Sequence, residues 1–186
     1  MAIAAAREIY NPVQRDRVTF LKTAAETGGE LTLLEMEVAP GGGNSLHTHT
    51  TYSERFTVIE GELGVQIDRQ QRVLRAGETE IVPARVVHRW YKASSRPARI
   101  YVELRPGHAG FEQALRIGYG LAADGRTNAA GIPTNPLHLA LLLELGGMHL
   151  VGPIAALAPL FGLLARVARR RGVGAELAAR YAAPQL

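Results

Sequence analysis

Three histidines and one glutamate are spaced so that they could bind one metal ion. His47 and His49 lie two residues apart, so on a strand both imidazoles would point to the same face. Glu54 follows after a bend, and His88 comes later, behind a proline turn. Three imidazoles and one carboxylate suit a borderline divalent ion such as iron, manganese, nickel, copper or zinc. We therefore expect all four side chains to converge at about 2.0–2.3 Å from one metal.

A chance arrangement of histidines is the alternative explanation. A His-x-His pair alone often occurs without a metal, but the added glutamate, the glycines and the later histidine make coincidence a poor explanation. The other three histidines, His108, His138 and His149, lack such partners, and we expect them to be structural or solvated. The chain has no cysteine, so disulfides and thiolate ligands are excluded.

The residues expected around the site are apolar. From Glu54, strand alternation places Phe56 and Val58 on the same inward face. Trp90 and Tyr101 are nearby in the pattern, where they could line a pocket for an apolar substrate or simply fill the core. A metal with four protein ligands would keep up to two positions open for a substrate or dioxygen.

Many short strands should position these residues. Between residues 17 and 105 the chain alternates β-branched and aromatic residues with polar ones, and glycine or proline separates many of the segments. This pattern is typical of a barrel or sandwich. The expected strands are Val18–Thr23, Leu31–Val38, Arg55–Glu60, Leu63–Asp68, Arg72–Arg75, Thr79–Val82, Val87–Lys92 and Arg99–Leu104.

After Pro106 the pattern becomes helical. We therefore divide the chain into a β-domain at 1–106 and a helical extension at 107–186, packed on the barrel or on a partner subunit. Asn135 before Pro136 is typical of an N-cap followed by proline in the first turn. The expected helices are Phe111–Leu121, Leu137–Leu145, Ile154–Arg170 and Ala175–Tyr181.

The extension contains an uncharged stretch at 146–165, followed by arginines at 166–171. Its length would allow it to span a membrane, but Pro153, Pro159 and several glycines disfavour one straight helix. We favour two helices whose apolar faces lie on the barrel or a second subunit, with membrane contact by the tail as the alternative. Deletion of 135–186 should then expose apolar surface and leave the four metal ligands in place.

Composition limits the remaining possibilities. The 186 residues suit one domain with an appendage, and the 47% hydrophobic content is ample for a core. The net charge of +4 is concentrated in the tail, so we expect no nucleic-acid partner. The N-terminal segment lacks the basic and apolar regions of a signal peptide, and we expect a cytoplasmic protein. We also expect a homodimer with an apolar interface above about 1,000 Å².

Two motifs of this chain resemble those of the cupins. The first cupin motif is Gly, five residues, His-x-His, three or four residues, Glu, six residues, Gly. The positions that match it are Gly41, His47, His49, Glu54 and Gly61.

The second cupin motif is Gly, five residues, Pro-x-Gly, two residues, His, three residues, Asn. Gly77, Pro83 and His88 match it, whereas Arg85 stands where Gly is usual and Lys92 where Asn is usual. Neither departure replaces a candidate ligand. Arg85 bears on the turn geometry, because glycine there normally allows a positive φ.

The resemblance implies an all-β fold, a cupin-type double-stranded β-helix or jelly-roll barrel, here with a C-terminal α-helical extension. It also implies a metal-dependent enzyme, which we expect to be an oxygenase-like oxidoreductase (dioxygenase) acting on an apolar or aromatic small molecule. Similarity to flavonol-cleaving cupins implies that Glu54 could act as a base. A non-redox cyclase or isomerase of natural-product biosynthesis, and a non-catalytic small-molecule-binding cupin, remain open alternatives.

Overall fold

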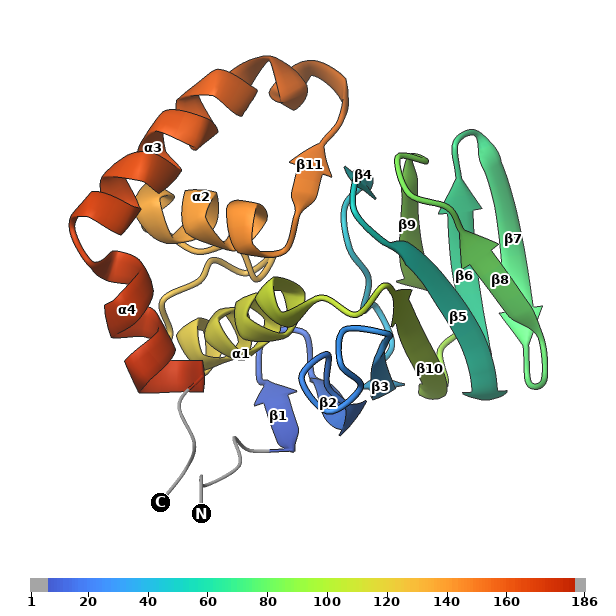
Figure 1. The fold of residues 1–186 in the computed structure, drawn as a ribbon. Coiled ribbons are helices and arrows are strands. Elements are labelled where there is room, and N and C mark those ends of the chain that lie inside the picture. Colours follow the sequence, from blue (N-terminus) through green and yellow to red (C-terminus); the bar gives the residue numbers. More distant parts are fainter. Residues whose placement is uncertain (1–6, 183–186) are drawn as a thin grey trace.

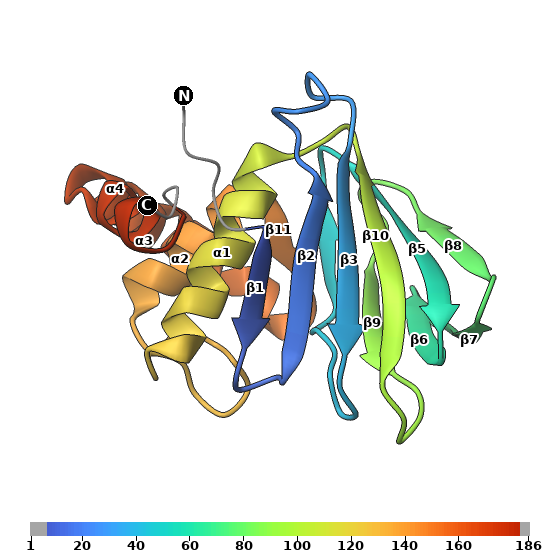
Figure 2. The same ribbon diagram turned by 90° about the horizontal axis from the view of Figure 1, so that it is seen from below.

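The computed structural model of this protein describes residues 7–182, and the following statements concern these residues. The expectation of no signal peptide falls mainly on residues outside this range. Two antiparallel sheets lie face to face, and the helices gather at one end of them (Figures 1 and 2).

Alternation of apolar and polar residues produces the strands of the larger sheet. In β3 (Thr32–Val38) the side chains of Leu34, Met36 and Val38 are buried, while those between them are less so. The sheet has the order β1-β2-β3-β10-β5-β8. Its other strands are β1 (Glu8–Asn11), β2 (Asp16–Lys22), β10 (Ala98–Arg105), β5 (Ser53–Glu60) and β8 (Thr79–Val82).

The smaller sheet contains the two strands that carry histidines of the expected site. Its order is β11-β4-β9-β6-β7, so β4 and β9 are neighbours. The strands are β4 (His47–His49), β9 (His88–Lys92), β6 (Glu62–Ile67), β7 (Gln70–Arg75) and β11 (Met148–Leu150). All eight expected strands are present: Thr79–Val82 has the expected bounds, and the other seven have shifted ends. β1, β4 and β11 are additional.

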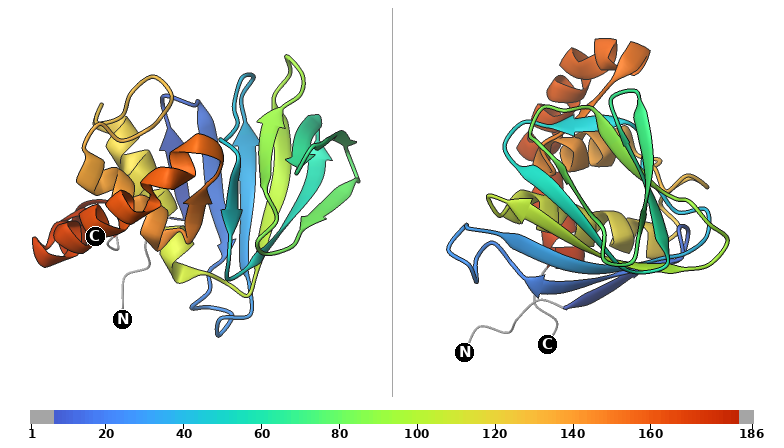
Figure 3. Two further views of the ribbon diagram at one scale, coloured as in Figure 1. Left: turned by 90° about the horizontal axis from the view of Figure 1, so that it is seen from above. Right: turned by 90° about the vertical axis from the view of Figure 1, so that its right-hand side faces the viewer.

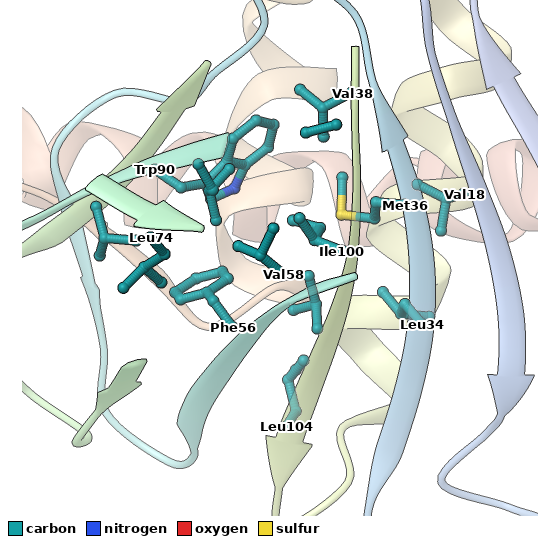
Figure 4. Packing of buried hydrophobic residues seen from close by; sticks show 14 of the residues in the cluster. Val18, Leu34, Met36, Val38, Phe56, Val58, Leu74, Trp90, Ile100 and Leu104 are labelled. Carbon is teal, nitrogen blue, oxygen red and sulfur yellow. The ribbon is translucent and has the colours of Figure 1, made fainter. Parts of the chain in front are cut away.

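The main apolar core fills the space between the two sheets (Figure 4). Phe56, Val58 and Ile100 come from the larger sheet, and Leu74 and Trp90 come from the smaller one. Close packing of such side chains makes the sandwich rigid, which lets it hold a few polar groups in a fixed geometry.

The helices form a second, smaller core of their own. They are α1 (Ala109–Ala123), α2 (Pro136–Leu145), α3 (Ala158–Arg170) and α4 (Val173–Leu177), followed by the π-helical turn η2 (Ala178–Ala182). Ile117, Leu141 and Leu177 are buried in this core. The all-β class expected from the sequence is therefore too narrow: the fold is an antiparallel β-sandwich with a substantial helical part (Figure 3).

Helix ends follow their local signals. The Asn135 side chain accepts a hydrogen bond from the Leu137 backbone N–H at 2.9 Å, which confirms the predicted N-cap of α2. The single helix expected at Ile154–Arg170 instead begins as a 3-10 segment, η1 (Gly152–Leu157), and becomes α-helical at Ala158. Pro159 explains this break, because proline is tolerated in the first turn of a helix but not inside it.

Candidate metal centre

The four expected residues come together between the two sheets. His47 and His49 form the ends of β4, and His47 lies directly opposite His88 in the register of β4 with β9. Residues opposite each other in an antiparallel pair point to the same side. Glu54 comes from β5 of the other sheet and faces them across the interior.

Distances within the cluster are short enough for one metal ion. The four candidate ligand atoms lie within 4.8 Å of one another. The Nε2 atoms of His47 and His49 are 3.0 Å apart, and His88 Nε2 lies 2.9 Å from Glu54 Oε2. The side chains are almost completely buried, so surface charges and solvent contribute little to this arrangement.

Hydrogen bonds on the outer side of the cluster orient two of the imidazoles. His47 Nδ1 lies 2.7 Å from the Ser45 carbonyl oxygen, and His88 Nδ1 lies 2.9 Å from the Val86 carbonyl oxygen. Because a carbonyl can only accept, both Nδ1 atoms must carry the hydrogen. In the neutral rings the lone pair is then on Nε2, which faces the cluster.

Tyr52 fixes the same tautomer in His49 as the two carbonyl groups fix in His47 and His88. Its hydroxyl lies 2.5 Å from His49 Nδ1 and donates to the Gly146 carbonyl oxygen at 2.8 Å. The hydroxyl hydrogen is thereby used, so His49 Nδ1 donates to the Tyr52 oxygen and Nε2 keeps its lone pair. Three imidazoles with fixed tautomers and one carboxylate fit a divalent metal ion.

Burial and charge set the protonation of the cluster. Burial, reinforced by His49 and His88, lowers the pKa of His47 to about 4, so this ring is neutral at pH 7. Burial alone would raise the pKa of Glu54, but its contacts with His49 and His88 lower it overall. Burial alone would lower the pKa of His88, but its contact with Glu54 raises it overall. A divalent ion would replace the proton held between these two groups.

The helical extension contributes directly to this centre. β11 pairs with β4, so that Met148 lies opposite His49 and Leu150 lies opposite His47. On α1, the Phe111 ring packs edge-on against His49, with ring centroids 6.4 Å apart. The structure therefore gives a reason to revise the expectation that the extension could be deleted without affecting the ligands.

Neither Tyr52 nor β11 was identified as part of the site from the sequence. Tyr52 lies three residues after His49, but a tyrosine at this spacing has no motif of its own. β11 has only three residues, which is too short to show a period of two, and its partner strand lies far away in the chain.

The turn before His88 keeps its geometry despite the unusual arginine. Arg85 has a φ of 69°, the left-handed conformation for which glycine is usual. Its backbone N–H donates to the His49 carbonyl oxygen at 2.5 Å. This bond ties the turn to the strand that carries the first two histidines.

Lys92 occupies the other unusual position, at the end of β9. Its Nζ donates to the Glu62 carbonyl oxygen at 3.0 Å and to Ser94 Oγ at 2.7 Å. Lys92 thus joins the ends of β9 and β6, a structural role that needs no contact with the metal ligands.

The remaining candidates lie outside the cluster. His108 caps α1 by accepting from the Phe111 N–H at 2.9 Å, His138 is buried, and His149 is exposed. Trp90 belongs to the main core. Tyr101 alternates with the buried Ile100 and Val102 and so points away from the interior, which makes its expected place in a substrate pocket wrong.

Comparisons with known proteins agree with this geometry. The family model described as Cupin domain matches residues 34–104, a segment that contains all four candidate ligands. Oxalate oxidase 2 of Hordeum vulgare is 28% identical over 129 residues, which cover 65% of this chain and 54% of that protein. The chain thus spans about half the length of this curated relative.

Two bacterial proteins are among the solved structures that match part of this chain. An RmlC-like cupin from Shewanella frigidimarina is 23% identical with a TM-score of 0.48, covering 55% of this chain and 86% of that one. The protein TT1209 from Thermus thermophilus is 22% identical with a TM-score of 0.46, covering 52% of this chain and 88% of that one. With both motifs and the domain match inside the sandwich, residues 34–104 of this chain form a cupin domain.

Proposed function

We propose that His47, His49, Glu54 and His88 bind a divalent metal and that the chain is a metal-dependent, oxygenase-like oxidoreductase. The observation that carries this proposal is the set of four buried ligand atoms within 4.8 Å of one another, supported by the outer hydrogen bonds of the three imidazoles. When bound, iron, manganese, nickel or copper would supply a Lewis-acid and redox centre for a substrate oxygen or dioxygen.

Glu54 is the residue to which we assign proton transfer. Its Oε2 faces His88 Nε2 at 2.9 Å and His49 Nε2 at 3.7 Å, so a proton taken from the substrate at Oε2 would be held beside two imidazoles. Burial keeps bulk water away from this oxygen. General-base catalysis by a positioned carboxylate typically contributes about 10²–10⁴-fold to the rate.

The substrate should be a small molecule with an apolar or aromatic body. Phe56 and Val58 continue inward from Glu54 along β5, and Tyr52 and Phe111 pack against His49. Apolar and aromatic walls favour such substrates. The name of the Hordeum vulgare relative supports oxidation chemistry and makes oxalate, a small dicarboxylate, the other substrate to assay.

Metal identity is the measurement that tests this function. The full chain would be purified without a metal-chelating column and its bound metals measured by mass spectrometry, followed by oxygen-electrode assays with a flavonol and with oxalate. A stoichiometric redox metal and substrate-dependent oxygen uptake are expected. Zinc without oxygen uptake would favour a non-redox cyclase or isomerase instead, and failure to bind any added divalent metal would favour a non-catalytic binding protein.

A ligand variant and a matched control complete the test. His88→Ala should lower metal affinity by at least about 100-fold, because it removes a direct ligand and leaves Glu54 without its nearest partner. His149→Ala removes an exposed histidine from β11 and should bind metal like the natural chain. Equal affinities of the two variants would contradict the assigned ligand set.

A further inference from the structure

The outer side of α3 and η1 is an apolar surface that the described residues leave uncovered. Four large side chains are each about half exposed: Ile154 (46%), Leu157 (46%), Leu160 (49%) and Leu163 (55%). The helical stretch Gly152–Arg170 has a mean hydropathy of 1.3, yet only 11% of it is buried. Ile154 also lines the pocket between α2, β11 and α3, so the apolar side chains that face outward are Leu157, Leu160 and Leu163. Exposed apolar side chains gathered in this way normally mark an interaction site.

The other side of α3 is already used for packing. Ala165 and Ala168 are buried, and Ala168 belongs to the helical core with Leu141 and Leu177. The helix is therefore held on the domain by one face and presents the opposite face outward. A single span across a membrane would require α3 to leave this core, and the change from the 3-10 helix η1 to α3 at Ala158 would interrupt the span.

Positive charge continues the exposed apolar surface. Arg166 and Arg170 lie three and seven residues after Leu163, a spacing that places all three on one helix face. Arg169 forms an ion pair with Glu144. Within residues 7–182, by contrast, neither Arg166 nor Arg170 has an acidic partner, and both are exposed. One face thus combines leucines toward its N-terminal end with unpaired cations toward its C-terminal end.

The position of this face leaves it accessible to a flat surface. Figure 2 shows α3 and α4 at the end of the molecule opposite β7 and β8, with α2 and α1 between them and the sheets. A large partner could therefore contact the outer face of α3 without touching the strands of the metal centre.

We propose that α3 and η1 dock this protein on anionic lipid bilayers, lying in the interface without crossing it. Leu157, Leu160 and Leu163 would enter the boundary between headgroups and acyl chains, and Arg166 and Arg170 would contact lipid phosphates. An anionic bilayer complements both parts of the face. A second copy of the same face would offer leucines but no acidic group for the arginines.

Vesicle flotation of the full chain tests this proposal. The natural chain should float with vesicles of phosphatidylcholine and phosphatidylserine, bind phosphatidylcholine vesicles much more weakly, and be released by high salt. Leu160→Gln/Leu163→Gln should abolish flotation, because it removes buried apolar area from the bilayer contact. Arg166→Gln/Arg170→Gln should lower partitioning into the anionic vesicles by about 30-fold, at the usual contribution of each surface arginine.

Matched controls separate docking from a general loss of apolar or basic surface. Ile81→Gln replaces a side chain of similar exposure (48%) on β8, and Arg69→Gln/Arg96→Gln removes two exposed cations from loops of the sandwich. Both should float like the natural chain. No flotation of the natural chain on anionic vesicles, or equal losses in the controls, would overturn the proposal.

Light scattering distinguishes a lipid bilayer from a second copy of the chain as the partner of this face. Suppose that the natural chain does not bind vesicles and that Leu160→Gln/Leu163→Gln converts a dimer into a monomer. The face is then an interface between two copies, and the lipid proposal is wrong. An unchanged oligomeric state in a variant that no longer floats would support lipid docking. Because metal content is measured separately, failure here leaves the proposed metal centre untouched.

Discussion

The metal centre and the outer face of α3 distribute polar and apolar groups in opposite ways. In the sandwich, three histidines and a glutamate are buried inside an otherwise apolar core. On α3, leucines are exposed beside arginines. Buried polar groups and exposed apolar patches are the two informative exceptions to ordinary burial. The comparison teaches that one small chain has two separate regions, one buried and one exposed, that folding alone does not explain.

The metal centre is nevertheless connected to the C-terminal extension that carries the outer face of α3. β11 extends the sheet that carries His47 and His49, and Tyr52 bonds both to His49 and to the end of α2 at Gly146. The strongest test of the comparison is therefore to break this connection and ask whether the metal centre depends on it.

Tyr52→Phe removes the hydroxyl and keeps the ring. Without its acceptor, His49 Nδ1–H loses the partner that fixes the tautomer, so metal affinity should fall by about 10–100-fold. A competition titration against a chelator measures this. Tyr91→Phe is the matched control, because the Tyr91 hydroxyl donates to the exposed side chain of Gln71 at 3.1 Å and not to a candidate metal ligand. If both variants bind metal equally well, the extension and the site are independent.

Asp16 lies where β2 meets α1. A substitution of this residue should change the stability of the protein but not its affinity for metal. Tyr119 of α1 donates to Asp16 Oδ2 at 2.8 Å, while Asp16 Oδ1 has no hydrogen-bond partner among residues 7–182. Burial raises the pKa of Asp16 above its ordinary value of 3.8. The folded state therefore holds this proton more tightly than the unfolded state, and its contribution to stability is lost as the pH rises through the raised pKa.

Asp16→Asn should thus stabilise the protein at pH 7, by on the order of 1 kcal/mol, since it removes a buried charge and keeps an oxygen for Tyr119. The gain should shrink as the pH approaches 4. Denaturant unfolding at several pH values measures it. Glu60→Gln, at an exposed carboxylate, should show no such trend. An equal pH dependence in the natural chain and Asp16→Asn would contradict this account.

The smallest expected effect concerns the turn before His88. Arg85→Gly should raise the free energy of unfolding by about 0.5–1 kcal/mol, because glycine adopts a φ of 69° without the steric cost of a side chain. Arg85→Ala keeps the β-carbon and should not stabilise. Thermal unfolding of both variants decides the matter, and a gain in Arg85→Ala would show that the side chain, and not the backbone, is responsible.

Sequence patterns predicted eight of the strands and the four clustered residues, because these depend on the spacing of neighbouring residues in the chain. Alternation gives the inward face of β5, and the two-residue spacing gives the shared direction of His47 and His49. Tyr52 and β11 escaped prediction because their roles depend on contacts between distant segments. The all-β class was too narrow for a related reason: periodicity indicated the helices but not that they share a core and supply a strand to the sheet.

The pairing of β11 with β4 has a consequence for how the protein is made. Tyr52 and Gly146 are 94 residues apart in the chain. During synthesis His47 and His49 therefore emerge long before β11, the strand that completes their sheet. Until β11 is made, one edge of β4 has no pairing strand. Contacts between such distant segments form slowly. The sheet around the candidate metal centre should thus be among the last parts of the molecule to mature, after the C-terminal segment has left the ribosome.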